Sequence, residues 1–169
     1  KIKNVSKYNN DYYCNLLKLI THLNLTTINN LNSWNTTFIT NMEEMFSEVS
    51  SFNQNIGNWN VSNVTTMEAM FSNATSFNQN ISGWNVQNVQ KMDYMFTNAI
   101  SFNQDISNWN VSKNTNMYYM FRGCPFNKDI SNWDVSKVTN MHFAFAQSSF
   151  NQNIGAWIVS NATSMASMF

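Results

Sequence analysis

Hydrophobic and polar positions recur along the chain with a period of about 25 residues. Each period carries one tryptophan, and successive tryptophans are separated by 25, 25, 25, 24 and 24 residues. The tryptophan column consists of Trp34, Trp59, Trp84, Trp109, Trp133 and Trp157. A methionine follows each tryptophan after eight residues, and a phenylalanine follows it after twelve. Self-similarity at a fixed period is typical of repeat architectures, so we expect six stacked copies of one unit.

Within each period, two short patterns predict two elements. Trp59-Asn60-Val61 alternates apolar and polar residues, and Ile56 supplies another inward side chain three residues earlier, so residues 56–61 predict a short strand. Met67, Met70 and Phe71 follow at positions i, i+3 and i+4, which predicts a short helix with one apolar side. A single unit of this kind cannot bury its own apolar face, so the units must stack to form a core.

A threonine column precedes the methionines and predicts the helix starts. Thr65 stands where an N-cap residue is expected, and its hydroxyl would accept a backbone N–H of the first turn. Thr40 with Glu43, and Thr65 with Glu68, match the spacing of a capping box. We therefore expect helices that begin directly after the threonines.

These elements predict an α/β repeat: a right-handed, leucine-rich-repeat-like solenoid of six roughly 25-residue strand-turn-helix units with parallel strands. Its core is expected to contain the tryptophan column and the methionine and phenylalanine columns. The latter include Met67, Met92, Met117, Phe71, Phe96 and Phe121. Methionines at i and i+3 on a packed element are usually core residues, so we assign them no binding role.

Residues 1–27 form a different segment, which we expect to cap the first repeat. Its apolar residues follow helical spacing after Asp11, a candidate N-cap. They are Tyr12, Tyr13, Leu16, Leu17, Leu19, Ile20 and Leu23. Residues 28–169 are expected to form one continuous solenoid domain. Because Phe169 falls inside a repeat, we expect further repeats or a docked partner beyond it.

One asparagine column has no exception among the five complete repeats. It consists of Asn53, Asn78, Asn103, Asn127 and Asn151. Asparagine side chains hydrogen-bond to nearby backbone in tight turns, so this column predicts an asparagine ladder along the stack.

The composition limits the function classes. Charged residues make up 11% of the chain, and the formal net charge is zero. A nucleic-acid-binding protein needs a basic surface, so we expect no nucleic-acid partner. No apolar run approaches the length of a membrane span, which argues against direct membrane insertion.

Candidate chemistry is sparse. The histidines are His22, in the predicted capping helix, and His142, at an expected exposed and variable position, so we expect no catalytic site. Stacked Asp105 and Asp129 could offer oxygen ligands to calcium, but without a third carboxylate we interpret them as turn residues. No metal or other cofactor is therefore expected. The cysteines Cys14 and Cys124 lie far apart in the repeat order, which argues against a disulfide between them.

The repeat Ile-Ser-x-Trp-Asn-Val-Ser-x-x-Thr-Asn-Met-x-x-Met-Phe resembles that of the BspA-like leucine-rich-repeat surface proteins, catalogued as Mycoplasma lipoprotein-type repeats of unknown function. The likeness covers about residues 28–169. The chain departs from the pattern in having Asn in place of Asp beside most tryptophans, although Asp134 keeps it. Asn114 and Ala162 replace apolar residues, and Ala144 replaces the second methionine. The resemblance implies a surface-exposed interaction protein, and bacterial members are associated with adhesion to host proteins.

Three function hypotheses follow. The first is a non-enzymatic scaffold for interaction or adhesion on a cell or virion surface, which binds another protein or a surface glycan. The alternative is a structural component of a large assembly such as a viral capsid, packed against its neighbours. An enzyme is the third choice.

Overall fold

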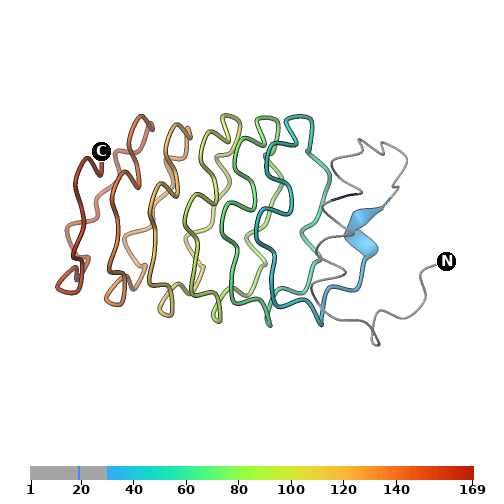
Figure 1. Ribbon diagram of the computed structural model, residues 1–169, viewed down its shortest axis with the longest axis horizontal. Coiled ribbons are helices and arrows are strands. Elements are labelled where there is room, and N and C mark those ends of the chain that lie inside the picture. Colours follow the sequence, from blue (N-terminus) through green and yellow to red (C-terminus); the bar gives the residue numbers. More distant parts are fainter. Residues whose placement is uncertain (1–18, 20–29) are drawn as a thin grey trace.

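A computed structural model describes Leu19 and residues 30–169. The described part is a row of successive coils that runs from the N-terminal side to the C-terminus (Figure 1). The one helical element within residues 30–169 is the short 3-10 helix η1, Leu31–Ser33. No α-helix and no β-strand is formed in this range. The predicted α/β solenoid of strand-turn-helix units is therefore wrong, although consecutive coils do stack in register.

The predicted strand over residues 56–61 is a pair of turns. The N–H of Trp59 donates to the carbonyl of Ile56 at 3.1 Å, and the N–H of Val64 donates to that of Val61 at 2.9 Å. Alternating side chains at a coil corner point inward as they would in a strand, so the alternation alone does not distinguish the two. The apolar residues that predicted a strand therefore belong to turns.

The predicted helix at Met67, Met70 and Phe71 is also absent, because the backbone between these residues turns left-handed. Ala69 has φ +52° and Asn73 has φ +58°, values that end an α-helix. The N–H of Met70 instead closes a turn on the carbonyl of Met67 at 3.1 Å. Two consecutive turns with positive φ at the third residue bring the same three side chains to one side.

Alternate N–H groups of these turns bond to the next coil. The donors Met67, Ala69 and Phe71 reach carbonyls of the following repeat at 3.0, 2.8 and 2.9 Å. Each pair of neighbouring coils also contributes one isolated parallel bridge. The bridges are Asn41 with Thr66, Thr66 with Lys91, Lys91 with Asn116, Asn116 with Asn140, and Asn140 with Ser164. Bonding between coils thus replaces the bonding within a helix that the sequence predicted.

The threonine column joins coils rather than capping helices. The Thr65 hydroxyl donates to the carbonyl of Thr40 at 3.2 Å, and the Thr65 N–H donates to the same oxygen at 2.8 Å. Thr115, Thr139 and Thr163 make the same two kinds of bond to the preceding coil. The N-cap and capping-box predictions are wrong, because no helix begins at these positions.

The core fills the inside of the coils. Trp59, Trp84, Trp109 and Trp133 are each 3% exposed, and each indole N–H donates to a carbonyl of the preceding coil. Trp34 and Trp157, in the outer coils, are partly buried. Phenylalanine rings stack within and between coils, with Phe71 3.9 Å from Phe77 and 5.6 Å from Phe96 between ring centres. The core is therefore continuous along the stack.

The predicted N-terminal capping helix lies outside the described residues, except for the exposed Leu19. Cys14 and His22 lie outside them too. In the part of the chain that is described, no helix has the length and apolar character to cross a bilayer.

Candidate functional site

The stacked turns carry two outward columns whose chemistry changes along the chain. The first column contains Glu43, Glu68, Asp93, Tyr118 and His142, and the second contains Glu44, Ala69, Tyr94, Tyr119 and Phe143. Their register is set by backbone bonds, since the N–H of Ala69 donates to the carbonyl of Asp93 and that of Tyr94 to the carbonyl of Tyr118, both at 2.8 Å. The same face is therefore acidic in the early coils and aromatic in the later ones.

Tyr94, Tyr118, Tyr119, His142 and Phe143 form what we call the aromatic cluster. The ring centres of Tyr94 lie 5.1 Å from Tyr118 and 5.3 Å from Tyr119. Tyr119 lies 4.8 Å from Phe143, and His142 stacks on Tyr118 at 5.7 Å with an interplanar angle of 7°. All five side chains are partly exposed. Rings that support one another in this way present a rigid contact surface with little entropy to lose on binding.

Polar contacts hold the tyrosines in place. The hydrogen bond with Tyr94 is the main cause that raises the pKa of Tyr118, and partial removal from water raises the pKa of Tyr119. The Arg122 guanidinium lies 5.5 Å from the centre of the Tyr119 ring, within cation–π distance. The Thr97 hydroxyl donates to the Tyr119 carbonyl at 2.6 Å. The phenols remain neutral near pH 7 because their pKa values lie above the ordinary value.

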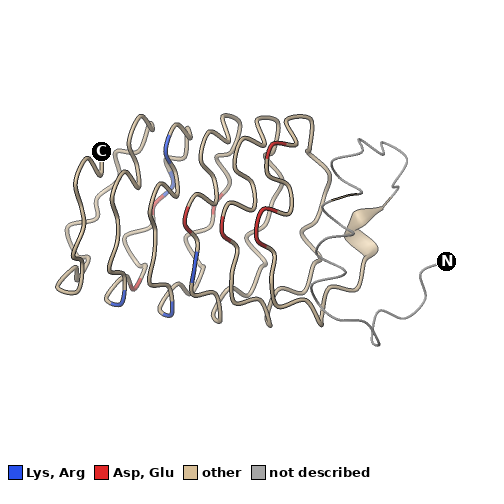
Figure 2. Ribbon diagram, viewed as in Figure 1, with Lys and Arg blue, Asp and Glu red and all other residues tan. Residues whose placement is uncertain are grey.

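Glu43, Glu68 and Asp93 form what we call the carboxylate row, visible as red segments in adjacent coils in Figure 2. Burial is the largest cause that raises the pKa of Glu68, and the charges of Asp93 and Glu43 raise it further. Burial also raises the pKa of Asp93, which is only 6% exposed. The charge of Lys91 lowers the pKa of both carboxyl groups, but its effect is smaller than that of burial. Glu68 and Asp93 also share a side-chain hydrogen bond, which raises the pKa of Glu68 and lowers that of Asp93.

His142 was expected at an exposed position, and its ring is half-buried within the aromatic cluster. Its Nδ1 atom is buried and has no hydrogen-bond partner among the described residues.

The Cys124 thiol lies in the core, where burial raises its pKa to about 12. A thiol with that pKa stays protonated near pH 7 and is a poor nucleophile.

Asp105 and Asp129, the candidate metal pair, each serve their own turn. Their carboxylates accept the N–H groups of Ser107 and Ser131 at 2.9 Å. The hydrogen bonds from these serines lower the pKa of both aspartates. Within residues 19 and 30–169, no group of three His, Cys, Asp or Glu side chains is placed to hold a metal ion. The structure therefore shows two turn aspartates in a column otherwise occupied by asparagine.

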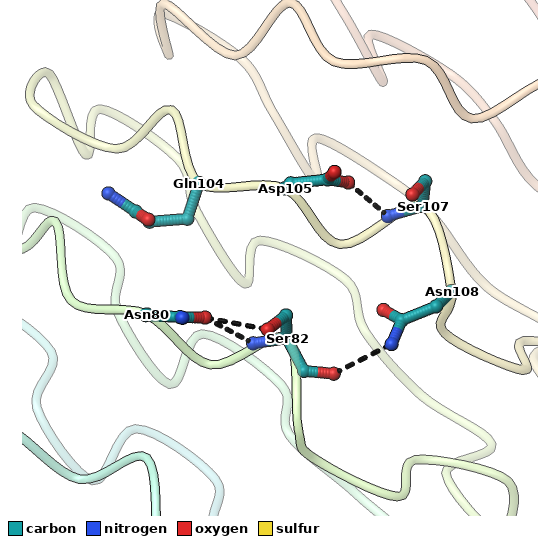
Figure 3. Close-up of a pocket in the computed structure, with 6 residues that line it drawn as sticks. All are labelled: Asn80, Ser82, Gln104, Asp105, Ser107 and Asn108. Atoms are coloured by element: carbon teal, nitrogen blue, oxygen red, sulfur yellow. Dashed lines mark hydrogen bonds between the residues drawn. The ribbon is translucent and has the colours of Figure 1, made fainter.

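A shallow hollow of about 350 Å³ lies beside Asp105 (Figure 3). Its lining residues are Asn80, Ser82, Gln104, Asp105, Ser107 and Asn108. Their polar groups bond to the coils themselves. The side-chain oxygen Oδ1 of Asn80 accepts from the N–H and hydroxyl of Ser82 at 2.9 and 2.7 Å, and the Asn108 side chain donates to the Ser82 carbonyl at 3.1 Å. The hollow is thus a space between two hydrogen-bonded turns.

The asparagine column links each coil to the next. The side-chain oxygens of Asn53, Asn78, Asn103 and Asn127 each accept the backbone N–H of the next asparagine in the column, at 3.0 to 3.1 Å. Gln79 and Gln104 add side-chain bonds to the same asparagines. These residues stabilise the stack and are unavailable as free acceptors.

Comparison with known proteins identifies the family. A family model described as "Mycoplasma protein of unknown function, DUF285" matches residues 14–125 and 123–169. The chain belongs to this family. No curated protein and no solved structure matches it. The family assignment accounts for the repeat and leaves the function to be argued from the surface.

Sequence reasoning missed the aromatic cluster. Of this cluster, only His142 was considered from the sequence, as a candidate catalytic residue, and Tyr94, Tyr118, Tyr119 and Phe143 were not singled out. The available signal was the change from Glu68 to Tyr118 at equivalent positions of an otherwise regular repeat. A surface column that changes from acidic to aromatic is not required by packing, so it is a candidate for recognition.

Proposed function

We propose that the chain is a non-enzymatic interaction scaffold of a cell or virion surface, which binds another protein through the face of stacked turns. The aromatic cluster carries this proposal. Tyrosine and arginine are enriched in protein interfaces, where rigid aromatic side chains act as anchors. Tyr94, Tyr118 and Tyr119 meet that description, because neighbouring rings hold them while they stay partly exposed.

The surface location is supported by the likeness of the repeat to BspA-like surface proteins. Members of that group in bacteria are associated with adhesion to host proteins, which agrees with an exposed aromatic face on a rigid stack. A glycan is the other surface partner to consider, and the test below separates it from a protein.

A second candidate is a structural part of a large assembly. The last coil favours it, because Ile158 is 65% exposed at an outward position where the other repeats have Asn or Asp. Exposed apolar groups of this kind gain stability when a neighbour covers them. Sedimentation of the purified chain distinguishes the two candidates: a stable monomer supports the adhesin-like scaffold, and ordered self-association through the last coil supports the structural part.

The binding proposal is tested by surface plasmon resonance of the chain against a panel of purified extracellular-matrix glycoproteins. We expect binding that survives enzymatic deglycosylation of the ligand and falls at least about tenfold in the double variant Tyr118→Ser and Tyr119→Ser. Phe38, which is 51% exposed in an early coil, provides the matched control. If Phe38→Ser weakens binding as much as the double variant, the aromatic cluster is not the binding site.

A further inference from the structure

The carboxylate row and the aromatic cluster form one continuous face. Asp93 and Tyr118 occupy the same column in adjacent coils, as the paired hydrogen bonds of Ala69 and Tyr94 show. Chain segments bonded in this way lie about 4.8 Å apart, so the column from Glu43 to Tyr118 extends roughly 14 Å. An extended peptide of about four residues has the same length.

Two side chains of this face, Asp93 and His142, each have a buried polar atom without a hydrogen-bond partner among the described residues. Asp93 is the acidic one. Its side chain is 6% exposed, and its Oδ1 atom has no hydrogen-bond partner in the described part of the chain. Burying a carboxylate without its hydrogen bonds is costly. A cation at the surface beside Asp93 would offset part of this cost through its attraction to the carboxylate charge. The side-chain hydrogen bond with Glu68 and the charge of Lys91 lower the pKa of Asp93, but burial has a larger effect and raises it.

The aromatic end of the face is suited to the same kind of ligand. Aromatic ring faces attract ammonium and guanidinium groups, and Tyr119 already holds the Arg122 guanidinium at 5.5 Å from its centre. Tyr118 and Tyr94 lie between this contact and the carboxylate row. Cations along the column would therefore meet carboxylates first and aromatic rings next.

We propose that this face binds an extended segment of a partner protein that bears lysine and arginine at alternate positions. Alternate side chains of an extended chain point to the same side and are about 7 Å apart, so three of them match the length of the column. The carboxylate row repels an acidic ligand, and a neutral sugar leaves the row without cationic donors. The proposal rests on the scaffold function above and names the chemistry of its partner.

Fluorescence anisotropy with the full chain tests the proposal. The probe is a fluorescein-labelled peptide, Lys-Ser-Arg-Ser-Lys-Ser, and its counterpart carries glutamine at each cationic position. We expect the basic peptide to bind and the counterpart to bind at least about tenfold more weakly. Combined Glu68→Gln and Asp93→Asn should weaken the basic peptide about tenfold, and Tyr119→Leu about threefold.

The combined variant Asp105→Asn and Asp129→Asn is the matched control. It removes the same two charges from exposed turns whose column elsewhere holds asparagine. We expect it to bind the basic peptide like the wild type. An equal loss in this control, or equal binding of the glutamine peptide, overturns the proposal. If the matrix protein still binds in a tyrosine-dependent way while the basic peptide does not, the scaffold function stands and the basic partner is wrong.

The stability of Asp93→Asn provides an independent check. Because the pKa of Asp93 is raised in the folded protein, ionisation opposes folding, and the protonated form stabilises it at low pH. We expect the variant to have a higher Tm than the wild type near neutral pH. The difference should shrink as the pH falls through the raised pKa of Asp93 and be lost below 3.8, the ordinary value. A lower Tm near neutral pH would mean that the carboxylate is satisfied internally, and the proposal would lose its basis.

Discussion

At the residue scale, left-handed backbone positions determine the local structure of each coil. Two such positions occur in most coils, for example at Ala69 and Asn73, and again at Tyr94 and Asn98. Asparagine adopts positive φ with little strain, but alanine and tyrosine do so at a cost. The turns could not be recognised from the sequence. Ala69 and Tyr94 occupy the first left-handed position of their coils, and alanine and tyrosine are also compatible with a helix.

Ala69→Gly distinguishes a turn from a helix at this position. Glycine relieves a left-handed strain of about 1–2 kcal/mol and costs about 0.5–1 kcal/mol through the unfolded chain. We therefore expect the free energy of unfolding in urea to rise slightly, by about 0.5–1 kcal/mol. Ala74→Gly is the control, because Ala74 is fully buried and has no positive φ. It should lower stability, and a similar loss at Ala69 would contradict the turn.

At the element scale, the units are turns that bond to neighbouring coils. The spacing of Met67, Met70 and Phe71 correctly indicated that three side chains share one side, since all three are fully buried. It did not indicate the backbone path, because the i, i+3 and i+4 positions coincide in a helix and in two linked turns. Hydrogen bonds to a coil about 25 residues away favour the linked turns over a helix, and a local sequence pattern cannot predict these bonds.

The asparagine column is the side-chain part of this bonding between coils. Asn103→Ala removes the acceptor for the Asn127 N–H, which is 3.1 Å away. We expect a loss of about 0.5–1.5 kcal/mol in the free energy of unfolding. The matched control is Asn58→Ala, at an exposed asparagine with no side-chain hydrogen bond within residues 30–169. If both variants lose the same stability, the column does not strengthen the stack.

At the scale of the whole molecule, the period and the inward columns could be predicted, but the face that we propose for binding could not. Trp59 and Trp84 recur because each coil packs a tryptophan into its core, and the period of the sequence reveals core residues that recur in this way. The aromatic cluster depends on departures from the repeat, at Tyr118 and His142, which a search for regularity averages out. Only the stacked structure brings these positions from separate repeats into contact.

Tryptophans of inner and outer coils should differ in their contribution to stability. Trp84 is 3% exposed, between two coils, and its indole N–H donates to the Ile56 carbonyl at 3.2 Å. Trp84→Ala should cost about 3–5 kcal/mol. Trp157, in the last coil, is only partly buried, so Trp157→Ala should cost less. Urea denaturation measures both, and equal losses would contradict a stack in which each coil depends on its two neighbours.

The bonding of each coil to its immediate neighbours also determines how the protein responds to pulling. Every hydrogen bond between described coils spans one repeat, as in Met67 to Lys91 and Thr65 to Thr40. Under tension between its ends, the stack can therefore release one outer coil at a time while the remainder stays folded. Each released coil of about 25 residues lengthens the chain by roughly 80 Å. A protein built in this way extends in steps under load, so its two ends can move apart without the whole fold being lost.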